Sequence, residues 1–586
     1  MEQRKAKLKA LEAKGIFPFK NKFTPDRACN DARSGFESGA LPEGTKVSVA
    51  GRITAHRDMG KSMFIDVRDQ SGRIQVYAQK NTLGDDLFHT FTHLDLGDFI
   101  GVTGTLFRTK TNEPSIKLES FTILAKALRP PPAKWHGLED TEIRYRQRYL
   151  DLIANPDVKD VMLKRSAIIH EIRNFFHGRG YVEVETPAMQ AIPGGAAAQP
   201  FKTFHNALGC EFYLRIALEL YHKRLLVGGI DKLFEIGKNF RNEGLSRRHN
   251  PEFTMLEAYQ AFGDYETMME TVESLIKHVA QKVLGSAVIT HEQPVATKHQ
   301  IAAFEMTLLG VGNQLFPGES GNVSYDKLIQ PWGTKFEQLL NKTGRPSEIA
   351  SEAVALANEA INSLISVLDD PTVQKELDPP TQAKELAHLR HLFETLECFS
   401  EPKIIDLTPN WRRAKYKDLV REVAGKDWFD VTPEERRRRA MEDLKLGGEI
   451  AKSYEDFEVT GAVFEKLIEP TLIQPTFVTH LPKELVPLAK LSPDDPTTVE
   501  VFECCINGQE ISPGYTEQND PIAQRATLEH QAGGEQQKLD EDFLVALEHG
   551  MPPAGGIGIG IDRLCMMLLG QESIRDVILF PQLKPK

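Results

Sequence analysis

Residues 234–259, FEIGKNFRNEGLSRRHNPEFTMLEAY, decide the fold of this chain, because their alternating pattern predicts a long β-hairpin around a charged loop. Side chains of a strand point alternately to its two faces, so Phe234, Ile236 and Phe240 share one face. The other face of the hairpin is predicted to gather the charged and aromatic side chains Arg241, Glu243, Phe253, Glu257 and Tyr259. The loop adds Arg247, Arg248 and His249.

This combination of side chains favours a binding cavity over a solvated sheet face. A solvated face explains alternating charges, but it does not explain a pair of aromatic residues among them. Arginine is suited to bidentate binding of phosphate or carboxylate, and an aromatic ring can stack on a base. The hairpin therefore indicates a nucleotide site with an acid beside it.

A second hairpin is predicted in VEVFECCINGQEISPGYTE, residues 499–517, because Asn507-Gly508 is a strong signal for a two-residue turn. Such a turn places Cys505 opposite Glu510, with Glu503 as a diagonal neighbour on the same face. Two adjacent carboxylates repel each other unless a cation lies between them, and oxygen ligands suit Mg²⁺ held partly by phosphates. The alternative is a pair of unrelated surface glutamates.

A third pattern is GGIGIGIDRLCMMLLG, residues 555–570, in which isoleucines alternate with glycines. One face of this predicted strand belongs to the core, and the other is bare backbone against which a ligand can lie. The glycines do not form a phosphate-binding GxGxxG or P-loop turn. Arg563, at the start of the following apolar helix, is the stronger candidate for phosphate binding.

The chain as a whole fits a reduced, cytoplasmic, multidomain protein of the α+β class. It has 586 residues, 41% of them hydrophobic, and its six cysteines show no CxxC spacing. No apolar run approaches a membrane span, and the N-terminus lacks the pattern of a signal peptide. The net charge of −12 means that any contact with nucleic acid must use a local basic patch.

The N-terminal part predicts a small β-barrel with a platform for bases. Short alternating strands occupy residues 41–126, after a helix and loop at 1–40 and before a proline-rich linker at 127–140. Phe64 and Gln75 are out of phase with the apolar neighbours of their strands. They predict either a stacking platform for single-stranded bases or a second small hydrophobic patch.

Three segments follow the linker. Residues 141–292 and 403–586 mix helices with strands, whereas 293–402 is predicted to be a helical insertion that packs on itself or on its host, without a catalytic constellation. The apolar stripe of the insertion predicts core packing, and its role stays open. The run EERRRRAM, residues 434–441, favours a solvated helix face over a contact with RNA.

Together these stretches resemble the signature motifs of the class II aminoacyl-tRNA synthetases. GRGYVEVETPAMQ (178–190) resembles motif 1, a dimer-interface element, the hairpin of 234–259 resembles motif 2, and GIGIGIDRL (556–564) resembles motif 3. Within the class, YLRIALELYHKRLLVGG (213–229) and PQLKPK (581–586) resemble lysyl-tRNA synthetases of the bacterial type. The resemblance covers nearly the whole chain except the insertion at 293–402. It implies an OB-fold anticodon-binding barrel and a catalytic domain built on an antiparallel sheet flanked by helices.

The resemblance also implies a role for individual residues. The expected reaction activates L-lysine with ATP, forms a lysyl-adenylate and transfers lysine to tRNA(Lys), in a homodimer that uses Mg²⁺. The implied catalytic residues are Arg241 and Arg563. The implied ATP-binding residues are Arg241, Glu243, Arg248, His249, Asn250, Phe253, Glu503 and Arg563, with Glu503 and Glu510 as metal ligands. The implied lysine-binding residues are Gly195, Glu219, Glu257, Tyr259, Tyr515, Glu517 and Gly558, and the implied anticodon readers are Phe64 and Gln75.

One position departs from the family pattern. Lysyl-tRNA synthetases usually have an asparagine where this chain has Pro513, so one amide contact to the substrate is expected to be absent. Proline also lacks the backbone N–H and is expected to bend the strand. We expect the protein to remain active, and we expect the absent amide contact to change its affinity for lysine.

Other functions stay open at this point. A lysine ligase that modifies a protein would lack the predicted anticodon barrel, and an aspartyl or asparaginyl enzyme would need cations where Glu517 stands. A non-catalytic tRNA-binding scaffold is disfavoured by the intact Arg241, Glu503, Glu510 and Arg563.

Overall fold

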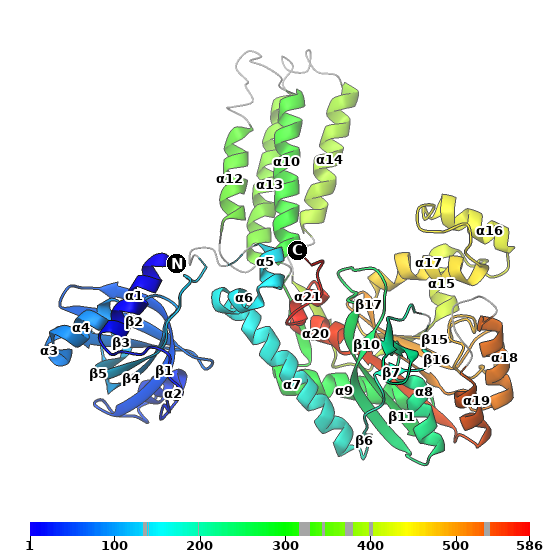
Figure 1. Cartoon of the computed structure of the whole chain (residues 1–586). Coiled ribbons are helices and arrows are strands. Elements are labelled where there is room, and N and C mark those ends of the chain that lie inside the picture. Colours follow the sequence, from blue (N-terminus) through cyan, green and yellow to red (C-terminus); the bar gives the residue numbers. More distant parts are fainter. Residues whose placement is uncertain are drawn as a thin grey trace. The chain divides into compact units, whose positions relative to one another are not determined.

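The computed structural model describes the chain except residues 133–137, 139, 197, 293, 316–328, 343–345, 370–378, 398–401, 533–539 and 586. The chain forms two compact units, Met1–Pro156 and Asp157–Lys586 (Figure 1). No helix among the described residues combines the length and the hydropathy needed to span a lipid bilayer.

The first unit contains a closed β-barrel with strand order β1-β2-β3-β5-β4. The strands are β1 (Lys46–Asp58), β2 (Ser62–Arg68), β3 (Arg73–Gln79), β4 (Phe99–Arg108) and β5 (Pro114–Ala125). The helices of this unit are α1 (Glu2–Ala13), α2 (Cys29–Glu37), α3 (Lys80–Leu83), α4 (Asp85–Thr92), α5 (Thr141–Arg146) and α6 (Arg148–Ala154). Alternation along β2 buries Met63, Ile65 and Val67, as the sequence pattern predicts.

The N-terminal segment differs from its prediction of one helix and a loop. A second helix, α2, follows the loop, and its Cys29, Ala32 and Phe36 are buried in the barrel core. In contrast, α1 buries none of its residues. The sequence CNDARSGFE gives only a weak indication of a helix, because α2 is short and only three residues on one of its faces are buried.

The second unit is built on a mainly antiparallel eight-stranded sheet with the order β14-β15-β16-β17-β18-β11-β10-β6. Its strands are β6 (Val182–Glu183), β10 (Lys232–Phe240), β11 (Glu252–Ala261), β14 (Arg412–Lys415), β15 (Thr476–Thr479), β16 (Val501–Ile506), β17 (Gln509–Thr516) and β18 (Ala554–Gly560). A small separate sheet contains β7 (Met189–Gln190), β8 (Lys202–His205) and β9 (Cys210–Leu214). The edge pairs β14–β15 and β6–β10 are parallel.

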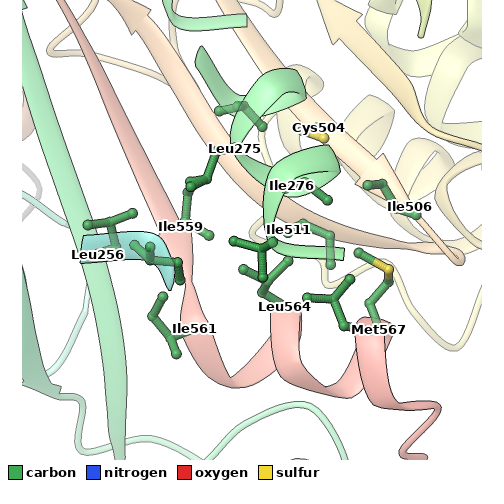
Figure 2. Close-up of a cluster of buried hydrophobic side chains, with 14 of the residues drawn as sticks. Leu256, Leu275, Ile276, Cys504, Ile506, Ile511, Ile559, Ile561, Leu564 and Met567 are labelled. Atoms are coloured by element: carbon green, nitrogen blue, oxygen red, sulfur yellow. The ribbon is translucent and has the colours of Figure 1, made fainter. Parts of the chain in front are cut away.

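Helices cover this sheet and form its core. They are α7 (Pro156–Gly178), α8 (Glu219–Val227), α9 (Tyr265–Leu284), α18 (Pro521–Ala532), α19 (Glu541–Glu548), α20 (Ile561–Leu569) and α21 (Ile574–Val577). Figure 2 shows side chains of α9 and α20, such as Leu275 and Leu564, meeting Ile559 of β18. Ile557, Ile559 and Ile561 are all buried, as the alternation with glycine predicts.

The insertion folds as a helical bundle that leaves and re-enters the unit through one pair of strands. Among the described residues, its helices are α10 (Pro294–Leu315), α12 (Gln330–Leu340), α13 (Pro346–Leu368) and α14 (Pro379–Glu397). The paired strands at its base are β12 (Val288–His291) and β13 (Lys403–Asp406), and Leu407 N donates to Ala287 O just outside them at 2.9 Å. Ala357, Ile361 and Leu364 of α13 are buried in the bundle core, as the helical stripe predicts.

The arginine run lies in a subdomain next to the sheet. This subdomain contains α15 (Tyr416–Ala424), α16 (Pro433–Arg438), a π-helical turn (Arg439–Asp443), α17 (Asp456–Val463), a second π-helical turn (Phe464–Ile468) and a 3₁₀ turn (Glu469–Thr471). Arg436 forms a two-pronged pair with Asp456 at 2.7 and 2.8 Å, and Arg439 forms one with Asp427 at 2.9 Å. These pairs fit the predicted helix surface, because they engage the guanidinium groups within the chain.

Candidate active site

The hairpin of β10 and β11 brings the predicted charged face together. Asn239 pairs with Phe253 and Glu235 with Glu257, so residues of the same parity share a face as expected. On its other side β11 pairs with β18, where Glu257 lies opposite Gly558. The glycine-bearing strand therefore lies directly beside the charged strand.

A cavity of about 230 Å³ opens on this face. The predicted ATP-binding residues that line it are Arg241, Glu243, Arg248, His249, Asn250, Phe253 and Arg563, together with Glu510. Pro513 also lines this cavity. Glu503 does not; it lines an adjoining cavity, whose wall includes Arg248, His249, Glu510 and Arg563 as well. The two cavities thus share four charged or titratable side chains.

The side chain of Arg241, which lines the first cavity, has a nitrogen that lacks a hydrogen-bond partner. Its Nε is buried without a hydrogen-bond partner, and its guanidinium carbon lies 5.2 Å from the centre of the Phe253 ring. Burial lowers the pKa of Arg241, while nearby Glu243 and Glu257 oppose that change. A buried guanidinium without a full set of partners is costly, so this position favours an anion.

Arg563 is held at the junction of the two cavities. Its Nη1 donates to Glu510 O at 3.1 Å and lies 3.3 Å from Glu510 Oε2. Its Nη2 lies 3.2 Å from Nε2 of His249, which must therefore accept with a neutral ring. Burial and the neighbouring Arg563 lower the pKa of His249, which keeps the ring neutral.

Arg248 and Arg247 diverge in the loop. Arg248 donates to Gly508 O at 3.0 Å and lies 3.5 Å from Glu469, so it reaches the turn of the second hairpin. The side chain of Arg247 is exposed. Asn250 is buried, donates to Glu252 O at 2.6 Å and leaves its Oδ1 without a partner.

The second hairpin has the predicted turn. Asn507 and Gly508 have φ angles of 59° and 70°, and Cys505 lies opposite Glu510. A bulge next to this pair places Glu503 opposite Pro513, so the ladder is already irregular before it reaches the proline.

The carboxylates of this hairpin form a cluster that sequence reasoning identified only in part. Burial raises the pKa of Glu503 well above its ordinary value, and the charges of Glu510 and Glu469 add to the shift. Glu469 was not predicted; its Oε1 accepts from Glu510 N at 3.1 Å. Such mutual repulsion is relieved by a cation, and all the oxygens are hard ligands of the kind Mg²⁺ prefers. Within the part of the chain that the structure describes, no three His, Cys, Asp or Glu side chains stand ready to hold a metal alone.

The predicted lysine-binding acids lie close to one another, since Glu219 and Glu257 both raise the pKa of Glu517. Tyr515 donates its hydroxyl to Glu219 Oε1 at 2.6 Å, and Tyr259 donates to Glu257 Oε2 at 3.1 Å. Glu257 also accepts from Leu218 N at 3.1 Å. All these side chains are largely enclosed, and burial raises the pKa of Glu257.

Glycines make room around these acids. A Cβ on Gly556 would lie 2.0 Å from Glu517 Oε1, whereas a Cβ on Gly558 would meet no atom closer than 3.8 Å. Gly195 has a φ of 84°, and a Cβ there would meet that of Ala217 at 3.1 Å. Gly556 thus allows Glu517 to enter, and the backbone at Gly558 stays open to a ligand.

Lys223 is a further member of this group that the sequence analysis did not identify. Its Nζ lies 2.7 Å from Glu219 Oε1 and 2.6 Å from Glu517 Oε2, and its side chain is completely buried. Glu219 and Lys223 stand four residues apart on α8, a spacing that signals a helical ion pair. That spacing could have revealed the contact with Glu219, but not the contact with Glu517.

The barrel presents a row of aromatic rings. Phe64 stacks on Tyr77 with ring centres 4.6 Å apart, and Tyr77 lies 5.7 Å from Phe107. Phe64 lies on the opposite face from the buried Met63 and Ile65, as predicted. Gln75 is more enclosed than its parity suggested, because it is 8% exposed and accepts from Ser115 Oγ at 2.9 Å.

Comparisons with known proteins show similarity along nearly the whole chain. The family described as tRNA synthetases class II (D, K and N) matches residues 140–584, and the OB-fold nucleic acid binding domain matches residues 47–124. The lysine–tRNA ligase of Pelotomaculum thermopropionicum is 40% identical over 592 residues, which cover 100% of this chain and 95% of the relative. The lysine–tRNA ligases of Carboxydothermus hydrogenoformans and Bacillus subtilis are 41% and 40% identical, over 99% and 100% of this chain and 97% of each relative.

Proposed function

Because the chain belongs to the class II tRNA synthetases and to their lysine–tRNA ligase family, we propose specific roles for the residues that surround its two cavities. The function is that of a lysine–tRNA ligase, which joins lysine to tRNA at the expense of ATP. The observation that supports these roles best is the position of Arg241. Its buried, incompletely bonded guanidinium lies 5.2 Å from the centre of the Phe253 ring and is close enough to Glu257 for that carboxylate to oppose the lowering of its pKa.

In the first step the carboxylate of lysine attacks the α-phosphate of ATP, and pyrophosphate leaves. This carboxylate is ionised at neutral pH, so no general base is required. The enzyme must instead bring two anions together and neutralise the charge that develops. Arg241 bridges the lysine carboxylate and the α-phosphate, Phe253 stacks on adenine, and Arg563 holds the γ-phosphate.

The remaining nucleotide contacts come from the loop and its surroundings. Arg248 and the neutral His249 assist Arg563 at the phosphate tail, and Glu243 and Asn250 approach the edge of the adenine. The unpartnered Oδ1 of Asn250 suits the exocyclic amino group of that base, because a buried acceptor is stabilised by a donor.

Glu503 and Glu510 would hold Mg²⁺, and the remaining ligands of the ion would be phosphate and water oxygens. When bound, Mg²⁺ supplies electrostatic stabilisation of the phosphate charges. The mutually repelling carboxylates fit this ion, since a divalent cation removes the repulsion that adds to the effect of burial in raising the pKa of Glu503.

Lysine is selected by the acid group beyond Arg241. Glu219 and the backbone at Gly195 receive the α-ammonium group, and Glu517 and Tyr259 receive the side-chain ammonium group. Glu257, Tyr515 and Gly558 complete the walls. A neutral side chain would leave buried carboxylates unpaired, so it is rejected.

The partners follow from the two units. The aromatic row of the barrel, with Phe64 and Gln75, binds the anticodon of tRNA(Lys) by stacking and hydrogen bonding. Near motif 1, Leu163, Val182 and Met189 are 43%, 52% and 54% exposed, and these apolar side chains support a homodimer interface. The free thiols among the described cysteines are compatible with the reducing cytoplasm.

Amino-acid-dependent exchange between pyrophosphate and ATP tests the proposed site. Lysine should stimulate the exchange, and Arg241→Ala should abolish it while binding of tRNA(Lys) persists. If no amino acid stimulates exchange while tRNA still binds, the chain is a tRNA-binding scaffold. Sedimentation analysis tests the homodimer, and a monomer over the micromolar range contradicts it.

A further inference from the structure

The acid group of the lysine site contains a cation of its own. Lys223 is fully buried on α8, and its Nζ lies between Glu219 Oε1 at 2.7 Å and Glu517 Oε2 at 2.6 Å. A third contact reaches Leu488 O at 3.5 Å, and the ring centre of Tyr515 lies 5.7 Å away. This ammonium group therefore touches both carboxylates that the proposed function assigns to the two ammonium groups of the substrate.

Lys223 does not saturate these carboxylates. Oε1 of Glu517 is buried without a hydrogen-bond partner and faces the space beside Gly556. Oε1 of Glu219 accepts a hydrogen bond from the Tyr515 hydroxyl and also pairs with Nζ of Lys223, so both contacts use the same carboxylate oxygen. Each carboxylate thus keeps acceptor capacity for a second cation.

The charges around the site can be counted from the contacts. When they are ionised, Glu219, Glu257 and Glu517 contribute three negative charges, and Lys223 contributes one positive charge. The nearby Glu235 is already matched by Arg215 at 2.7 Å and contacts His222 at 3.1 Å. With all three carboxyls ionised, the group therefore holds two net negative charges, which equals the number of ammonium groups on lysine.

We propose that Lys223 is a fixed internal counter-ion of the lysine site, which orients Glu219 and Glu517 and leaves two negative charges for a substrate with two ammonium groups. It is a positioning and specificity-determining residue, and it is not displaced by the substrate. This proposal rests on the assignment of the lysine site made above.

The electrostatics of the side chains support this role. Although burial alone would lower it, the pKa of Lys223 is raised by Glu219 and Glu517, so the ammonium form persists. Burial raises the pKa of Glu517, and Lys223 opposes that shift. Without this cation, Glu517 would hold a proton to higher pH and could not pair with the substrate.

The test uses two variants, Lys223→Met and Lys223→Gln, in which a neutral side chain replaces the ammonium group. Lysine-dependent pyrophosphate exchange is measured from pH 6 to pH 9, with the KM for ATP as a check on the fold. We expect the KM for lysine to rise at least about 30-fold near neutral pH. The increase in the KM for lysine, relative to the unaltered protein, should be smaller at high pH, because the carboxyls then ionise without the help of Lys223. The KM for ATP should stay within about twofold of its value in the unaltered protein.

Lys126→Met is the matched control. Lys126 is also buried and is paired with Asp95 and Asp98, but it lies in the first unit. The same chemical change there should leave the KM for lysine and its pH profile unchanged.

Three outcomes would overturn the proposal. An unchanged KM for lysine in both variants would show that no internal cation is needed. A lower KM would show that Lys223 competes with the substrate. A rise that is equal at every pH would indicate simple damage to packing. Failure of the unaltered protein to exchange pyrophosphate with lysine would refute the assigned site itself, which separates the two conclusions.

Discussion

Replacement of Pro513 by asparagine should increase the affinity for lysine. Pro513 lines the first cavity, and its Cγ lies 3.9 Å from the Cβ position of Gly558, where the backbone is open to the substrate. The resemblance to lysyl-tRNA synthetases implies an asparagine at this position, and the side chain of proline offers neither donor nor acceptor there. Pro513→Asn places an amide against the charged substrate.

The expected size follows from opposing contributions. A hydrogen bond to a charged group contributes about 1.5–3 kcal/mol. Ordering the new side chain costs about 1 kcal/mol. The net gain of roughly 0.5–2 kcal/mol corresponds to a KM for lysine lowered about 2- to 30-fold. Loss of the proline ring should lower the free energy of unfolding by about 0.4–1 kcal/mol, since the unfolded chain becomes freer.

Lysine-dependent pyrophosphate exchange at saturating ATP measures this effect, and thermal unfolding measures the stability. Pro513→Ala is the control, because it removes the ring without adding an amide. Its KM for lysine should stay within about twofold of the unaltered protein. Equal KM values for the asparagine and alanine variants would refute the reasoning, since the amide would then contribute nothing.

Three further predictions concern the metal, the acids and the barrel. Glu510→Gln should raise the Mg²⁺ concentration for half-maximal exchange at least about 10-fold, and an unchanged Mg²⁺ titration would exclude Glu510 as a ligand. Burial raises the pKa of Glu257 and Glu517, and a cation binds their ionised forms; the KM for lysine should therefore fall as pH rises through neutrality, and a flat profile would contradict this. Phe64→Ala should remove stacking worth about 1–3 kcal/mol, which raises the KM for tRNA roughly 5- to 150-fold in charging assays. Pyrophosphate exchange should not change in that variant, and a defect in both assays would point to general instability.

The regular parts of the site were predictable from the sequence because they depend on short-range geometry. Alternation along a strand placed Phe253 and Glu257 on one face, and the Asn507-Gly508 turn set Cys505 opposite Glu510. These features need only the two-residue period of a strand and a turn with positive φ angles.

Other parts depend on contacts between distant segments. Parity cannot foresee the bulge that moves Glu503 opposite Pro513, because an extra residue shifts every later position. The pairing of Lys223 with Glu517 joins α8 to the segment after β17. Local sequence patterns could not predict it, because the two residues lie far apart in the chain. The roles of the individual site residues remain predictions that the experiments above address.

The strand pair β12–β13 has a consequence for how this chain can vary. Because residues 287 and 407 are hydrogen-bonded neighbours, the entire bundle leaves and returns at a single point of the host unit. A segment attached in this way can lengthen, shorten or change its surface over generations without altering the register of the catalytic sheet. The sequence of the bundle can therefore change independently of the residues that surround the substrate.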